Sequence, residues 1–304
     1  MSTNLADPTR LATPPTFQAV SLSRRIKNGF ATALVWGAFL IAIIPLVWVL
    51  YTVVQRGFPV ILDGDWWQKS LSGLLARQQG GGAYHAIYGT LVQGLVCGVI
   101  SVPIGIMIAI YLVEYGGRSK LAKATTFMVD ILTGVPSIVA ALFIYTVWIT
   151  YAGMGRSAFA VSIALVLLMV PVVVRTTEEM LKIVPDELRE ASYALGIPKW
   201  KTIVKIVIPT ALSGILTGIM LALARVMGET APVLVLAAYA PFINYNLFSG
   251  PMASLPLMMV NERNNPTQAG FERLWGAAIT LVLIITLFNL LATVISRVLA
   301  PKTK

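Results

Sequence analysis

Ionisable side chains inside apolar segments are the residues of this sequence best suited to chemistry. Arg225 and Glu229 stand four residues apart in the run ALARVMGETAP, and Arg175 and Glu178 stand three apart near the end of another apolar run. A guanidinium group binds a tetrahedral oxyanion through two parallel hydrogen bonds, and a neighbouring carboxylate weakens that hold enough for the anion to leave. The four residues are therefore candidates for an anion path.

Both pairs also have a purely structural interpretation, because an arginine and a glutamate on one helix face can form an ion pair that fixes helix register. A row of small residues precedes Arg225: Gly214, Gly218 and Ala222. Such a row predicts close approach of another helix and turns the arginine away from lipid. Arg175 lies nearer the end of its span and can instead extend to the lipid headgroups. The sequence leaves both interpretations open.

Other kinds of site are not indicated. His85 and Cys97 are the only residues of their types, so the sequence has no metal-ligand cluster and no intramolecular disulfide. It also has no Gly-x-x-x-x-Gly-Lys-Ser/Thr phosphate loop, so any ATP and Mg²⁺ must be bound by another chain. We predict no catalytic residue, no metal and no cofactor for this chain.

The composition is that of a membrane protein that crosses the bilayer several times. Of its 304 residues 57% are hydrophobic and 12% are charged, and several apolar runs reach the length of a bilayer span. The net charge of +10 arises from basic residues in short loops, which is typical of membrane orientation, so we predict no nucleic-acid partner.

The predicted fold is all-α, with a polar N-terminal tail at 1–23 and a transmembrane domain at 24–300. Six spans are expected, at about 30–54, 84–113, 124–150, 157–178, 205–238 and 274–298, and a loop at 179–204 joins the fourth to the fifth. Gly134-Val135-Pro136-Ser137 should kink the third span, and Asp130 in that span should cap or pair. The segment 55–82 is expected to be external, with Trp66 and Trp67 as interface anchors and a flexible glycine tip.

The distribution of basic residues predicts the orientation. Six spans put both termini on one side. Fifteen lysines and arginines lie in the termini and in the loops 114–123 and 179–205, against six in the other loops. Basic residues concentrate on the cytoplasmic side, so both termini and the loop 179–204 should be cytoplasmic.

The only long polar and basic interruption deep inside the apolar sequence begins in that loop and runs from Asp186 to Pro209. Pro185 and Asp186 suit a helix start, Gly196 suits a left-handed cap, and Pro198 can open a second helix that leads into the fifth span. The pattern predicts a short helix, a glycine corner and re-entry into the membrane.

Glu190-Ala191-Ser192, Gly196, Ile206 and Pro209 resemble the EAA loop of permease subunits of bacterial ABC importers. Ser192 stands where alanine is usual, and Ile208 stands where leucine usually precedes the proline. The resemblance implies that Glu190, Ala191, Ser192 and Gly196 belong to a coupling helix that docks into a groove of a cytoplasmic ATPase. The alternative is an amphipathic helix on the lipid surface.

Further motifs resemble the A-type permease subunits of the high-affinity phosphate importer (Pst system). They are Arg225 with Gly228-Glu229-Thr230-Ala231-Pro232, Gly134-Val135-Pro136-Ser137, and Val174-Arg175-Thr176-Thr177-Glu178. The resemblance implies the type I ABC permease architecture, import of inorganic phosphate, and a place in the bacterial inner membrane. It also implies a homologous second permease (C-type), two ATPase subunits that bind ATP and Mg²⁺, and an external phosphate-binding protein as partners.

Three alternatives follow from the residues. Another oxyanion such as sulfate or molybdate fits the arginines equally well, whereas methionine would leave two intramembrane arginines unexplained. A stand-alone ion-coupled carrier belongs to a different class, in which the polar loop would be an ordinary connection. The absence of an evident internal repeat argues against that carrier. In the leading interpretation the chain is a transport subunit without enzymatic activity of its own.

Overall fold

The structure is a computed structural model that describes residues 21–299. Most of the predicted N-terminal tail, residues 1–20, and residues 300–304 therefore lie outside the described residues. Within 21–299 every regular element is a helix. The chain divides into two units between Tyr51 and Thr52, a point inside helix α1 (Leu22–Ile61).

The described part of the first unit is a single helix, residues 22–51 of α1. Its apolar stretch has a mean hydropathy of 2.5, which is enough to cross a bilayer. A single helix cannot bury its own side chains, and an apolar helix of this length is suited to a lipid environment.

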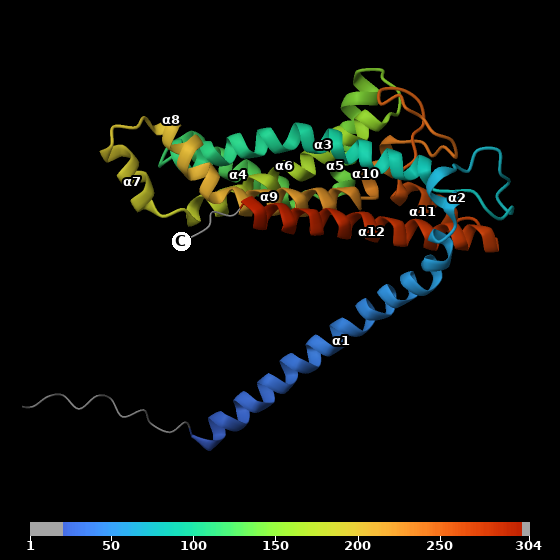
Figure 1. The fold of residues 1–304 in the computed structure, drawn as a ribbon, viewed down its shortest axis with the longest axis horizontal. Coiled ribbons are helices and arrows are strands. Elements are labelled where there is room, and N and C mark those ends of the chain that lie inside the picture. The colour runs from blue at the N-terminus through green and yellow to red at the C-terminus, as the bar shows by residue number, and fades with distance from the viewer. Residues whose placement is uncertain (1–20, 300–304) are drawn as a thin grey trace, which may run out of the picture. The chain divides into compact units, whose positions relative to one another are not determined.

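The second unit holds the other helices (Figure 1). They are α2 (Gly64–Gln68), α3 (Tyr84–Ile110), α4 (Lys120–Gly134), α5 (Ser137–Ile144), α6 (Ala158–Ile183), α7 (Asp186–Ala194), α8 (Lys199–Thr202), α9 (Ile208–Met227), α10 (Ala231–Leu236), α11 (Leu255–Arg263) and α12 (Gln268–Leu299). Short π-helical segments continue α3 (Tyr111–Tyr115) and α5 (Tyr145–Tyr151) and precede α9 (Ile203–Val207).

Five helical segments among the described residues are long and apolar enough to span a membrane, and a sixth candidate is bent. The five are Leu22–Ile61, Tyr84–Tyr115, Ala158–Ile183, Lys199–Met227 and Gln268–Arg297. The sixth consists of α4 and α5, which meet at an angle of 104°. The predicted kink is confirmed at this point, because Pro136 has no N–H to continue the helix and restricts the residue before it.

Helix α6 occupies the centre of the second unit and packs against α3, α9, α4 and α5, while α12 packs against α9 and α11. Figure 1 shows α3, α6, α9 and α12 running lengthwise beside one another. Small residues allow the close contacts: a Cβ atom on Gly218 would lie 2.7 Å from Cβ of Thr176, and one on Gly214 would lie 2.1 Å from Sδ of Met180. The small-residue row predicted on α9 therefore faces α6.

The fifth span differs from the predicted 205–238. Helix α9 ends at Met227, and α10 begins at Ala231 with Pro232 in its first turn. Glu229 consequently lies in the break between the two helices, so the prediction that Arg225 and Glu229 share one helix face was wrong. The Gly228 cap and the proline of α10 both favour such an interruption over a continuous helix.

The segment 55–82 also differs from the prediction. Trp66 was predicted to anchor the chain at the membrane interface, but it is 2% exposed and its Nε1 donates to Oγ1 of Thr280 at 2.9 Å. Trp67 remains 40% exposed. The predicted flexible glycine tip is tied to the core, because Arg273 donates hydrogen bonds to the carbonyl of Gly80. Tertiary packing thus places in the core, or bonds to it, residues that composition alone assigned to an external loop.

Candidate functional site

Two helix breaks meet at one groove of about 610 Å³. One is the bend between α4 and α5, which contributes Ser137, and the other is the interruption between α9 and α10, which contributes Gly228 to Ala231. Ile285 of helix α12 also lines the groove. In membrane transporters, interrupted helices line substrate sites because their free backbone groups need a polar environment.

Arg225 and Glu229 both line this groove. Arg225 is exposed and Glu229 is half-buried. Within residues 21–299 Arg225 has no ion pair and its guanidinium makes no hydrogen bond, although Glu229 follows only four residues later. The backbone explains part of this separation: the N–H groups of Gly228 and Glu229 bond back to the carbonyls of Arg225 and Val226, so the chain turns before the carboxylate. The guanidinium is left available for a ligand.

Arg175 is surrounded differently. Its Nη1 donates to Oε2 of Glu178 at 2.8 Å, and its Nη2 donates to Oδ1 of Asp130 on α4. Nζ of Lys182 donates to the other oxygen of Glu178 at 2.7 Å. The predicted pairing of Asp130 is confirmed, and the two basic side chains face two carboxylates. The donors of Arg175 therefore serve to join α4 to α6.

The loop after α6 has the predicted shape. Helix α7 begins after Pro185, Gly196 has a φ of +73°, and Pro198 precedes α8. A φ in this range favours glycine, because a Cβ atom would strain the backbone there even though nothing lies within 4 Å of that position. Helix, glycine corner and second helix are thus confirmed.

One arginine anchors the loop to the spans. Nε and Nη2 of Arg189 donate to Oε1 of Glu114 at 3.1 and 3.0 Å, and its remaining donors reach the carbonyls of Leu181 and Val184 and the carboxylate of Asp186. The side chain of Glu114 is only 4% exposed. A buried carboxylate with a fully bonded arginine fixes the position of α7 against the end of α3.

Lys199 at the start of α8 adds a second connection from the loop to the segment Tyr111–Tyr115. Its Nζ donates to the backbone carbonyl of Glu114 and lies 5.0 Å from the ring centroid of Tyr115. The loops 114–123 and 179–205, both rich in basic residues, therefore lie at the same end of the second unit.

The residues predicted to dock on an ATPase divide into two groups. Glu190, Ala191 and Gly196 are exposed. Ser192 is 3% exposed, and its hydroxyl bonds to the hydroxyl of Thr202 at 2.7 Å. We therefore expect Ser192 to hold α7 against α8, while the other three remain candidates for contact with a partner.

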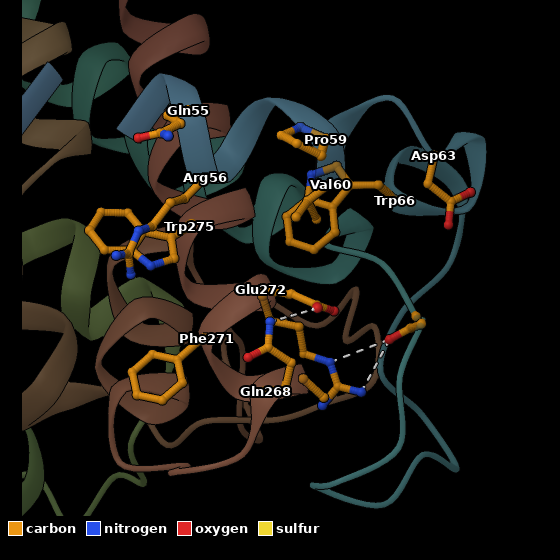
Figure 2. A pocket seen from close by; sticks show the side chains of 14 residues that line it. Gln55, Arg56, Pro59, Val60, Asp63, Trp66, Gln268, Phe271, Glu272 and Trp275 are labelled. Carbon is orange, nitrogen blue, oxygen red and sulfur yellow. Dashed lines mark hydrogen bonds between the residues drawn. The ribbon is translucent and has the colours of Figure 1, made fainter. Parts of the chain in front are cut away.

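A second cavity of about 610 Å³ lies between the end of α1, the start of α12 and the segment 63–81 (Figure 2). The guanidinium of Arg56 lies 5.5 Å from the ring centroid of Trp275, and Oε1 of Glu272 accepts from Nε2 of Gln268 at 3.0 Å. Asp63 also lines this cavity. Arg273 lines it as well as Arg56, so its two carboxylates are matched by two guanidinium groups, and Nη2 of Arg273 already donates to the carbonyls of Gln78 and Gly80.

The sequence did not identify every residue that matters here. Arg189 and Glu114 stand 75 residues apart, so no local spacing links them. Ser137 belonged to a recognised motif, but its place beside Arg225 depends on the packing of α5 against α10. Among the described residues no cluster of His, Cys, Asp and Glu could hold a metal ion.

Comparison with protein families agrees with the motifs. Residues 101–304 match the model of the binding-protein-dependent transport system inner membrane component. The chain is 57% identical over 282 residues to the phosphate transport system permease protein PstA 1 of Mycobacterium tuberculosis, covering 93% of this chain and 91% of that protein. It is 43% identical over 278 residues to the corresponding PstA of Yersinia pestis, with 90% of each chain covered.

Solved structures with lower identity share the fold. A chain of a bacterial alginate ABC transporter superposes with a TM-score of 0.65 at 13% identity, covering 91% of this chain and 97% of that one. A chain of the MetNI methionine ABC transporter, in inward-facing conformations, superposes with a TM-score of 0.56 at 20% identity, covering 72% and 94%. The chain therefore belongs to the PstA family of phosphate transport system permease proteins, multi-pass inner-membrane components of ABC importers.

Proposed function

We propose that this permease moves inorganic phosphate through the groove lined by Arg225 and Glu229. The observation that carries the proposal is the guanidinium of Arg225, which has no partner within residues 21–299 and lies beside two helix breaks. A planar guanidinium without a partner among the described residues can bind an oxyanion through two parallel hydrogen bonds. Arg225 is exposed in the isolated chain, which leaves room for a second permease to complete the path.

The carboxylate in the same groove supports phosphate over a fully ionised oxyanion. Phosphate near neutral pH keeps a proton that it can donate to Glu229, whereas sulfate has none and would meet only repulsion. The first turn of α5, which opens on the groove at Ser137, adds backbone N–H groups that have no partner inside the helix.

Arg175 and Glu178 are better explained by the structural alternative. Their hydrogen bonds with each other and with Asp130 and Lys182 leave few donors for a passing anion. We propose that they fix the register of α4 and α6, and that Arg225 carries the larger share of anion binding.

We further propose that the chain works with a homologous C-type permease, two ATPase subunits and an external phosphate-binding protein. In this arrangement both termini and the α7–α8 loop face the cytoplasm, in keeping with the excess of basic residues at that end. The exposed residues Glu190 and Ala191 would contact the ATPase, whose nucleotide and Mg²⁺ this chain does not bind. The anchor between Arg189 and Glu114 would transmit the motion of α7 to the spans.

A double substitution tests the anion path. In a reconstituted complex, Arg225→Gln should abolish phosphate uptake, and adding Glu229→Gln should not restore it, because no positive charge then meets the anion. An ion pair with a merely structural role predicts the opposite, since removing both charges would relieve the uncompensated carboxylate. Uptake by the double variant near the wild-type rate, with normal amounts of complex, would refute the proposal. Competition by sulfate serves as the specificity control.

A further inference from the structure

A third, much smaller cavity shares Glu229 with the groove at Arg225. It has a volume of about 10 Å³, which is the space that one buried water molecule requires and far too little for phosphate. Its polar lining comes from Thr90 and Gln93 of α3, from Glu229, and from Ser254 before α11. Glu229 therefore belongs to both the groove and this cavity.

Gln93 is a polar residue of this cavity whose side-chain amide nitrogen is buried without a partner among the described residues. It is 3% exposed, and its Nε2 has no solvent contact and no hydrogen-bond partner among the described residues. Its backbone carbonyl accepts from Oγ of Ser162 at 3.3 Å, which holds this part of α3 against α6. An amide donor kept in such a place without an acceptor is costly, so its bonding partner should lie in the cavity.

The other hydroxyls of the cavity are largely occupied. Oγ1 of Thr90 donates to the carbonyl of Ala86 at 2.9 Å and accepts from the N–H of Leu255 at 2.8 Å. Oγ of Ser254 accepts from the N–H of Leu257 at 3.4 Å, and its own proton reaches no acceptor among the described residues. Gln93 and Ser254 therefore both offer donors, and the one charged side chain lining the cavity is the carboxylate of Glu229.

We propose that one water molecule in this cavity joins Nε2 of Gln93 to the carboxylate of Glu229 and holds that carboxylate back from Arg225. Gln93 is then a positioning residue: it keeps the guanidinium of Arg225 free for the anion by giving Glu229 another partner. The proposed water site depends only on the cavity and the residues that line it. The proposed effect of this water on transport depends in addition on the anion path described under the proposed function.

Gln93→Met tests the role of the amide, because methionine keeps the length of the side chain and removes its donor. Without the water bridge Glu229 should pair with Arg225 and compete with the anion, so the KM for phosphate of the reconstituted complex should rise by about tenfold with a smaller change in kcat. Asn289→Leu is the matched control: it also replaces an amide that has an unpartnered buried atom, but Asn289 is half-buried, lies on α12 and lines neither the groove nor the small cavity. Its KM should stay at the wild-type value.

A double-mutant cycle separates positioning from a general loss of stability. In a Glu229→Gln background, Gln93→Met should cause no further rise in KM, since the residue through which it acts is neutral. Additive losses, or a KM unchanged by Gln93→Met in the wild-type background, would overturn the inference. Should Gln93→Met fail to assemble, Gln93→Asn retains an amide with space for a second water and should restore both assembly and uptake; equal failure of the two variants would also overturn it.

The same variants distinguish failure of the inference from failure of the anion path. If the Arg225→Gln Glu229→Gln variant transports phosphate normally, the path is wrong, and the thermal unfolding of the Gln93→Met and Glu229→Gln variants then decides the water site. Non-additive shifts in Tm support the bridge between the two side chains. Additive shifts exclude it.

Discussion

The charged residues near the two ends of helix α9 differ in their hydrogen bonding. Near its start, at the α7–α8 loop, Arg189 is bonded to Glu114, and Lys199 contacts the same segment of α3. At its far end Arg225 faces an open groove without a partner among the described residues. The first region uses its charges to fix the position of a loop, whereas the second keeps a charge available.

This difference indicates which charges can bind a ligand. A guanidinium whose donors are already satisfied, as in Arg189 and Arg175, gains little from an anion and would first have to give up its carboxylates. A guanidinium without a partner gains the full free energy of its hydrogen bonds with the anion, because it gives up no carboxylate. Substitutions in the two regions should therefore separate into losses of transport and losses of stability.

The largest effect is expected for Arg225→Gln compared with Arg175→Gln. Loss of two charge-assisted hydrogen bonds of about 1.5–3 kcal/mol each should lower phosphate uptake by about 10²- to 10⁴-fold for Arg225→Gln, with normal assembly. Arg175→Gln should keep uptake within about threefold, because Lys182 still compensates Glu178. Radiolabelled phosphate uptake by proteoliposomes, normalised to the amount of complex, measures both. Equal losses in the two variants would contradict the comparison.

Arg189→Met should cause the largest loss of stability. It leaves the buried carboxylate of Glu114 without a charged partner, which costs about 3–5 kcal/mol. Adding Glu114→Gln should recover much of that loss, since the uncompensated charge is then gone. Thermal unfolding of the purified complex checks both variants. A single variant as stable as the wild type would show that the anchor does not hold the loop.

Gly196→Val should weaken the coupling of this chain to the ATPase at a moderate energetic cost. A β-branched residue at a φ of +73° strains the backbone by about 1–3 kcal/mol, although the space around the position is empty. Gly196→Asn is the control, because asparagine tolerates this conformation. ATPase activity and uptake should both fall in the valine variant and persist in the asparagine variant. Wild-type coupling in both would refute a role of the corner in docking.

Ser192→Ala should have the smallest effect. It removes the hydrogen bond with Thr202 and should destabilise the loop by about 1 kcal/mol, while the exposed face of α7 stays unchanged. Binding of the ATPase should therefore remain near the wild-type level in a pull-down assay. A loss of ATPase binding larger than that of Glu190→Lys would place Ser192 on the docking surface instead.

The sequence by itself determined the features that depend on local composition. Apolar runs of bilayer length predicted the six spans, Pro136 predicted the bend of the third, and the spacing of Pro185, Gly196 and Pro198 predicted the α7–α8 loop. Each follows from the conformations that a proline or glycine permits, or from the free energy of placing apolar residues in lipid. Family motifs then identified the class of transporter.

The tertiary structure alone decided how each charge is used. Arg175 and Arg225 have similar neighbours in the sequence, yet Asp130, 45 residues before Arg175, bonds to that arginine, whereas Arg225, just before the break after Met227, has no ion pair within residues 21–299. Glu114 and Arg189 meet across 75 residues, and Gln93 lines a cavity with Glu229 only because α3 packs beside the α9–α10 break. An ionisable side chain acquires its role from the groups within a few ångströms of it, and helix packing brings those groups from distant parts of the chain.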